Sequence, residues 1–228
     1  MKRVDQIREN LDTVRAKIDA AAAKAGRSAD EITLIAVTKS FPLSDLEILY
    51  SLGVRQFGEN RDQEASSKVE QLPSDINWHF QGQIQSNKLK SITNWAGCIH
   101  SVDQIKYAQI ISEQSSGQPK PIFIQVSLDQ PPESRGGVDP AKLIELANQI
   151  TKLPGVALQG LMAVAPTDSP TESAFANLSK IHGDFLLTFS NAKSLSSGMS
   201  GDYEMAISYG ATHLRIGSSI LGNRDQIA

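Results

Sequence analysis

The chain has 228 residues, 40% of them hydrophobic and 21% charged, with a formal net charge of -3 and a single cysteine, Cys98. This length suits one well-packed domain, the slightly acidic balance excludes broad nucleic-acid binding, and the apolar stretches are far shorter than the roughly 18 residues of a membrane span. Because one cysteine cannot form an internal disulfide and the N-terminal residues lack an apolar leader segment, we expect a cytoplasmic, single-domain protein over residues 1–228.

The first predicted element is a helix over residues 1–26. Its apolar side chains recur every three or four positions, as on one face of a helix. They are Val4, Ile7, Leu11, Val14, Ile18, Ala21 and Ala25. Gly26 follows at the position expected after a helix C-terminus.

A strand is predicted at residues 32–38, because a short β-branched run that is apolar on both faces is typical of a buried parallel strand. Strands and helices then alternate. Further strands are predicted at 54–57, 77–80, 98–100, 122–126, 156–162, 194–196 and 213–216, and helices at 44–52, 63–72, 87–92, 103–112, 140–152, 172–187 and 203–209. Eight such units favour an α/β fold of the (β/α)8 TIM type over residues 32–222, rather than an open sheet, with an extra N-terminal helix.

Polar residues at the ends of the first three strands mark a candidate site, because functional residues of such barrels lie where the strands end. Lys39 follows the first strand; it is either a nucleophilic amine activated by desolvation or a lysine that only reaches solvent. Glu59 and Asn60 are expected to project toward the same mouth, where Asn60 either contacts a ligand or caps the next helix. His79 is a ligand contact or an ordinary hydrogen-bonded residue.

The last two strands end in loops that combine glycine with serine, where such barrels commonly hold phosphate. Ser200 offers a hydroxyl, and Gly217 and Ser218 offer amides at a helix start. Either loop alone is also compatible with an ordinary turn. Arg215 lies within the last strand, where a guanidinium needs an acceptor, either a salt-bridge partner or a ligand.

Motifs along nearly the whole chain resemble the pyridoxal phosphate homeostasis proteins, whose single domain is similar to the N-terminal barrel of bacterial alanine racemase. They are Ala36-Val37-Thr38-Lys39, Phe57-Gly58-Glu59-Asn60, Trp78-His79-Phe80, Gln85-Ser86-Asn87-Lys88, Ile99-His100-Ser101-Val102-Asp103, Gly160-Leu161-Met162, Gly198-Met199-Ser200 with Asp202, and Arg215-Ile216-Gly217. The chain departs from the family at Ser197, where a methionine is common, around Ser218-Ser219, and in the loop at 129–137. These departures concern loop detail.

The resemblance implies that the cofactor is pyridoxal 5'-phosphate (PLP), held as an aldimine on Lys39. Ser200, Gly217 and Ser218 would then hold its phosphate, and Arg215 would face the pyridine nitrogen. The resemblance also places Asn60, His79 and Met162 around the ring. An arginine at that nitrogen disfavours ring protonation, which weakens PLP as an electron sink.

We therefore expect a monomeric PLP-binding protein of intracellular PLP homeostasis that stores, buffers or delivers PLP to PLP-requiring apoenzymes. It would need no metal and catalyse no fast reaction. One alternative is a PLP-dependent amino acid racemase or lyase with Lys39 as acid and base. Alanine racemase, however, takes a second base from a separate domain and partner subunit. The other alternative is a Schiff-base aldolase acting on a sugar phosphate.

Overall fold

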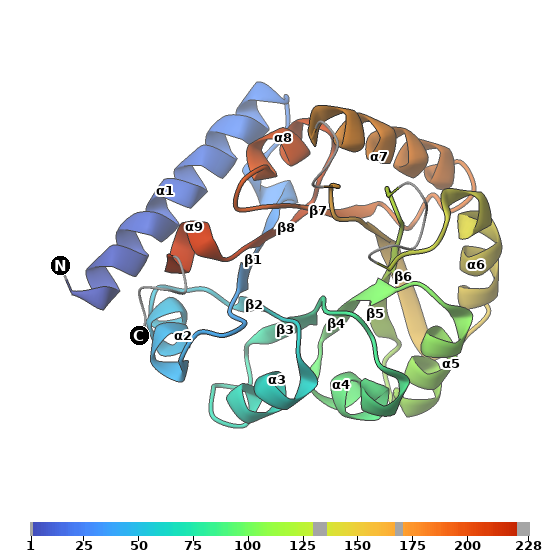
Figure 1. The fold of residues 1–228 in the computed structure, drawn as a ribbon, viewed down its shortest axis with the longest axis horizontal. Coiled ribbons are helices and arrows are strands. Elements are labelled where there is room, and N and C mark those ends of the chain that lie inside the picture. The colour runs from blue at the N-terminus through green and yellow to red at the C-terminus, as the bar shows by residue number, and fades with distance from the viewer. Residues whose placement is uncertain (1, 130–135, 167–170, 223–228) are drawn as a thin grey trace.

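The structure, a computed structural model, describes residues 2–129, 136–166 and 171–222. In it eight parallel strands close into one barrel, ordered β1 to β8 in sequence, with β8 hydrogen-bonded back to β1 (Figure 1). The strands are β1 (Thr33–Val37), β2 (Gln56–Glu59), β3 (Asn77–Phe80), β4 (Cys98–Val102), β5 (Lys120–Gln125), β6 (Val156–Met162), β7 (Ser194–Met199) and β8 (His213–Ile216). The predicted TIM-type barrel is confirmed.

Helices surround the sheet on the outside (Figure 1). They are α1 (Arg3–Lys24), α2 (Leu43–Ser51), α3 (Asp62–Val69), α4 (Leu89–Trp95), α5 (Ile105–Gln114), α6 (Leu143–Ile150), α7 (Thr171–Leu186), α8 (Tyr203–Ser208) and α9 (Ser218–Leu221). Short 3-10 helices are η1 (Ala29–Glu31), η2 (Ser86–Lys88) and η3 (Pro140–Lys142). Within the described ranges, no helix is long and apolar enough to cross a membrane.

The extra N-terminal helix α1 lies across α8 and α9 (Figure 1). The side chains it buries there belong to the predicted stripe, apart from Ala22: Ile7, Leu11, Val14, Ile18 and Ala22. Gly26 has φ 67°, the left-handed conformation that commonly ends a helix and that glycine adopts without a Cβ penalty. At the other end of α1, Arg3 and Asn10 donate hydrogen bonds to the carbonyl oxygens of Leu221 and Ile220. The helix therefore anchors α9, which starts at the barrel mouth.

Five strands differ from their predicted bounds by one to three residues at an end: β1, β2, β4, β5 and β7. β2 begins two residues later than predicted, because the Val54 N–H donates to the Leu49 carbonyl oxygen and so completes the end of α2. β7 extends to Met199, since Ser196 and Ser197 are buried strand residues without the apolar side chains that announce a strand. Residues 130–135 of the predicted loop at 129–138 lie outside the described residues.

Candidate functional site

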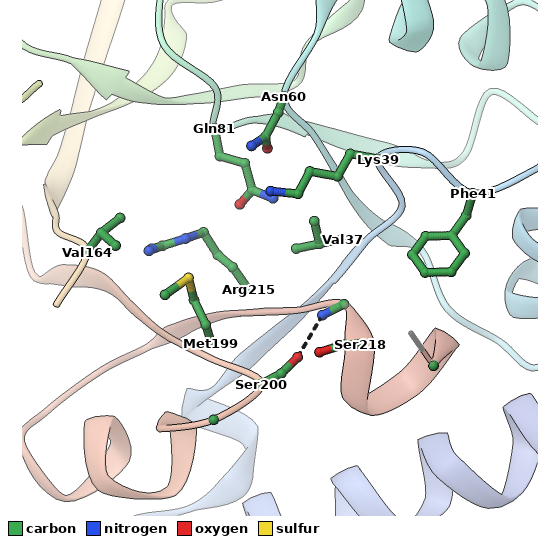
Figure 2. A pocket seen from close by; sticks show the side chains of 13 residues that line it. Val37, Lys39, Phe41, Asn60, Gln81, Val164, Met199, Ser200, Arg215 and Ser218 are labelled. Atoms are coloured by element: carbon green, nitrogen blue, oxygen red, sulfur yellow. Dashed lines mark hydrogen bonds between the residues drawn. The ribbon is translucent and has the colours of Figure 1, made fainter. Parts of the chain in front are cut away.

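A cavity of about 680 Å³ opens where the strands end (Figure 2). It is lined by Val37, Lys39, Phe41, Asn60, Gln81, Val164, Met199, Ser200, Gly201, Arg215, Gly217, Ser218 and Gly222. The charged members of this lining are Lys39 and Arg215, both cations, and the described wall contains no carboxylate, histidine, cysteine or tyrosine. A wall with this charge favours an anionic ligand.

Most of the predicted site residues meet at this cavity. Six of the eight line it: Lys39, Asn60, Ser200, Arg215, Gly217 and Ser218. His79 and Met162 do not. Each precedes a lining residue by two positions, Gln81 and Val164 respectively, and because side chains two apart point the same way, both lie one layer deeper in the barrel.

Two amide side chains in the cavity carry acceptors that the protein leaves unused. The Oδ1 of Asn60 and the Oε1 of Gln81 are buried without a hydrogen-bond partner among the described residues, and both side chains point into the cavity (Figure 2). Asn60 does not cap α3, whose N-cap is Arg61 and has no side-chain cap. Buried polar atoms are rarely left unpaired, so these oxygens suit ligand donors. The contribution of Gln81 was missed, although strand alternation placed it on the same side as His79.

Lys39 is the second residue after β1, and its side chain points into the cavity (Figure 2). The residue before it is held by a buried ion cluster under α3. The Thr38 hydroxyl donates to Glu59 Oε1 at 2.7 Å, and Lys68 Nζ donates to the Thr38 carbonyl oxygen at 2.8 Å. Lys68 Nζ also donates to Glu59 Oε1 at 2.7 Å. The end of β1 is therefore fixed from behind.

The residue after Lys39 is held by the same cluster. Ser40 has φ 66°, a left-handed conformation that costs a non-glycine residue about 1–2 kcal/mol. Its backbone N–H donates to Glu64 Oε1, which also accepts from Lys68 Nζ at 2.7 Å. The left-handed turn and this carboxylate together set the direction in which Lys39 leaves the strand.

Glu59 does not project toward the mouth as expected. Its side chain is fully buried under α3, because consecutive strand residues point to opposite faces and Asn60 takes the cavity side. Burial raises the pKa of Glu59, and the opposite pull of Lys68 and Thr38 only partly offsets it. Burial also acts to raise the pKa of Glu64, but hydrogen bonds from Lys68 and the Ser40 backbone outweigh it and lower that pKa. Lys68 is thus the cation on which the cluster depends.

The loop after β7 and the start of α9 form a set of anion donors. Ser200 Oγ accepts the backbone N–H groups of Gly217 and Ser219, each at 3.2 Å (Figure 2 marks the first). Its own proton has no acceptor among the described residues, nor do the backbone N–H groups of Gly201 and Ser218. An O–H and two N–H groups at one end of a cationic cavity are the donors that a phosphate needs. Gly198 is not one of these donors. It packs against α8, where a Cβ would meet the Ala206 Cβ at 2.7 Å.

Arg215 lies at the floor of the cavity and is only 5% exposed. Its Nη1 donates to the carbonyl oxygen and Oγ of Ser196, each at 2.8 Å, and its Nη2 donates to the Ala163 carbonyl oxygen at 2.9 Å. Among the described residues no carboxylate forms an ion pair with it, although the charge of Asp202 acts on it from a distance. Burial lowers the pKa of Arg215 to about 10, which leaves the group cationic at neutral pH. Two of its five N–H donors are not used by the described protein groups.

One deeper cluster has the composition of a metal site. Ligand atoms of His79, Cys98 and His100 lie within 4.8 Å of one another. The two imidazoles, however, hydrogen-bond to each other and to neighbouring side chains, and burial raises the pKa of the Cys98 thiol to about 12. Because a metal needs free nitrogens and a thiolate, we assign none to this cluster.

Comparison with known proteins places this geometry in a family. Residues 4–225 match the alanine racemase N-terminal domain family. A pyridoxal phosphate homeostasis protein from Corynebacterium glutamicum is 38% identical over 220 residues, covering 92% of this chain and 99% of the relative. The protein of the same name from Escherichia coli K12 is 36% identical over 235 residues, covering 97% and 98%.

Solved structures agree with this placement. PipY from Synechococcus elongatus PCC7942, solved with PLP bound, matches with a TM-score of 0.83 and 32% identity, covering 95% of this chain and all of PipY (100%). Alanine racemase from Clostridium difficile 630 matches with a TM-score of 0.75 and 16% identity over 95% of this chain and 56% of the racemase, a likeness of fold alone. The chain belongs to the pyridoxal phosphate homeostasis protein family, which is built on the alanine racemase N-terminal domain.

Proposed function

We propose that this protein binds PLP in the cavity at the barrel mouth and takes part in PLP homeostasis. The observation that carries the proposal is the composition of that cavity. A lysine and an arginine stand at a wall without carboxylates, and unpaired O–H and N–H donors gather at one end. The names of the relatives and the PLP-bound PipY structure support the same cofactor.

Each lining residue has a role that fits its contacts. Lys39 Nζ bonds covalently to the aldehyde carbon, with release of one water molecule. The Ser200 hydroxyl and the Ser218 backbone N–H hold the phosphate, and Gly217 supports them by donating its backbone N–H to Ser200 Oγ. Arg215 directs an N–H toward the pyridine nitrogen, and Asn60 lies beside the ring. His79 and Met162 support these residues from the layer beneath. When bound, PLP supplies a reactive aldehyde and an electron-withdrawing ring.

The same lining argues against fast amino acid chemistry. A racemase must move protons on both faces of its substrate, and Lys39 is the one side chain of the usual acid-base types among the described lining residues. Arg215 stays cationic and keeps a proton off the ring nitrogen. We therefore propose storage, buffering or delivery to PLP-requiring apoenzymes as the role. We further propose a monomeric, cytoplasmic protein with one domain over residues 1–228.

A titration with PLP tests the proposed function. We expect wild-type protein to develop a visible absorption band distinct from that of free PLP, and Lys39→Ala to develop none. Lys88→Ala is the matched control, because Lys88 is exposed and does not line the cavity. Wild-type protein that shows no PLP binding in equilibrium dialysis would contradict the proposal and promote the sugar-phosphate alternative.

A second experiment tests the absence of fast catalysis. The PLP-loaded protein is incubated in D₂O with small amino acids, and deuterium at the α-carbon is followed by NMR. We expect no exchange above that of free PLP at the same concentration. Exchange at the turnover rates of ordinary enzymes, on the order of 1 per second or faster, would establish the racemase or lyase alternative.

A further inference from the structure

A chain of side-chain hydrogen bonds runs through the barrel interior from the cavity floor. From Arg215 it passes to Ser196 Oγ at 2.8 Å, from Ser196 Oγ to His100 Nδ1 at 2.9 Å, and from His100 Nε2 to His79 Nδ1 at 2.9 Å. His79 Nε2 then meets Gln56 Oε1 at 2.8 Å. Because β4 and β7 are not neighbours in the sheet, the contact between His100 and Ser196 must cross the barrel.

Arginine fixes the direction of every bond in this chain. A guanidinium only donates, so Ser196 Oγ accepts from Arg215 and must find an acceptor for its own proton. His100 Nδ1 is its one such acceptor within the described part of the protein. His100 therefore carries its proton on Nε2 and donates to His79 Nδ1.

The same logic passes to the next ring. His79 accepts on Nδ1, so its proton is on Nε2 and is donated to Gln56 Oε1. That oxygen also accepts from Asn77 Nδ2 at 2.8 Å, which orients the Gln56 amide. Asn77 Nδ2 lies 3.3 Å from His79 Nε2 as well, but with the proton on Nε2 its hydrogen bond goes to the shorter contact with Gln56. A second proton on His79 would point at the His100 N–H, and one on His100 would take away the acceptor of the Ser196 hydroxyl, so the network favours two neutral rings. Burial acts in the same direction, lowering the pKa of His79 to about 3 and that of His100 well below its usual value.

We propose that Ser196, His100 and His79 are positioning residues that hold the Arg215 guanidinium at one orientation under the cofactor ring. The proposal rests on the proposed PLP site and deepens it, because it assigns the orientation of the Arg215 guanidinium to residues that do not touch the ligand. His100 is kept in plane by stacking on Phe123, with 4.4 Å between ring centroids and 14° between planes. Because the stacked His100 ring is held in one orientation, it holds Ser196, and through Ser196 the Arg215 guanidinium, in a fixed position.

The chain offers a matched pair of serines for the test. Ser196→Ala removes the link between Arg215 and His100, whereas Ser197→Ala removes a buried hydroxyl that has no partner among the described residues. The first readout needs no cofactor. In protein labelled with ¹⁵N-histidine, we expect His79 and His100 in wild type to be neutral with the proton on Nε2. We expect Ser196→Ala to shift the tautomer balance of His100 and Ser197→Ala to leave it unchanged.

The second readout is PLP itself. Loss of one hydrogen bond to Arg215 is expected to weaken PLP binding roughly 3- to 10-fold in Ser196→Ala and to shift the absorption band of the bound form. His100→Phe should do the same. His100→Gln can accept from Ser196 and donate to His79, so it should restore the PLP affinity and the absorption band that His100→Phe loses. This pair tests the same link if Ser196→Ala fails to fold.

Three results would overturn the proposal. They are a His100 proton on Nδ1 in wild type, equal effects of Ser196→Ala and Ser197→Ala, or no difference between His100→Phe and His100→Gln. Failure of wild type to bind PLP would instead contradict the proposed function, and it leaves the tautomer result readable.

Discussion

Replacement of Lys68 by methionine should be among the most damaging single changes outside the cavity. Methionine has nearly the same length, so packing is kept and the charge is removed. The change leaves Glu59, which is fully buried, without its cation, and it frees the turn around Lys39. Breaking a buried pair by removing one partner costs about 3–5 kcal/mol.

The cost should depend on pH in a stated direction. Burial already raises the pKa of Glu59 in the folded protein, and loss of Lys68 raises it further. A carboxyl with a raised folded-state pKa adds most to the free energy of unfolding at a pH below its unfolded-state pKa. That stabilisation is lost as the pH rises through the folded-state pKa. The deficit of Lys68→Met should therefore be smaller at about pH 5.5 than at about pH 8.

Urea denaturation at both pH values measures this deficit. Lys180→Met is the control, because Lys180 forms an exposed pair with Asp184 that is worth about 0.3–0.5 kcal/mol. The double variant Glu59→Gln/Lys68→Met should recover most of the loss, since no buried charge remains. If Lys68→Met cost no more than Lys180→Met, or if its deficit grew as the pH fell, the reasoning about this cluster would be refuted.

Three further predictions follow from single contacts. Ser200→Ala should weaken PLP binding roughly 10-fold or more, as expected for the loss of a hydrogen bond to a charged group. It should leave the binding of pyridoxal, which has no phosphate, nearly unchanged. Equal losses of affinity in titrations with both ligands would contradict the assignment of Ser200 to the phosphate. Gly198→Ala should destabilise the fold, because φ is 92° and the new Cβ would meet Ala206. Gly183→Ala within α7 should instead stabilise it by up to about 1 kcal/mol. Thermal unfolding of the two variants measures both effects. Cys98 should resist a thiol reagent in native protein and react after unfolding, and rapid native labelling would show that the thiol is accessible.

The order of elements was predictable from the sequence because it depends on local patterns. The stripe of α1 and the apolar runs of β1 and β6 are read within a few residues, and their alternation with helices is enough to favour a barrel. Lys39 and Arg215 stood out for a related reason, since a long cation beside buried strand residues needs an explanation.

Contacts between distant strands were not predictable in this way. His100 and Ser196 are 96 positions apart, and they meet only because the barrel closes. The depth of His79 and the outward direction of Glu59 depend on register and on which face each strand presents, and a shift of one residue reverses both. Strand alternation placed Gln81 on the same side as His79, but an amide at a strand end carries no chemistry that marks it as a ligand contact.

The most direct test of the PLP site is borohydride reduction of PLP-loaded protein, followed by peptide mapping with mass spectrometry. We expect one phosphopyridoxyl adduct in wild-type protein, on the peptide that contains Lys39, and no such adduct when Lys39→Ala protein is treated in the same way. An adduct spread over exposed lysines such as Lys88, or one equally abundant in Lys39→Ala, would show that Lys39 is not the anchor.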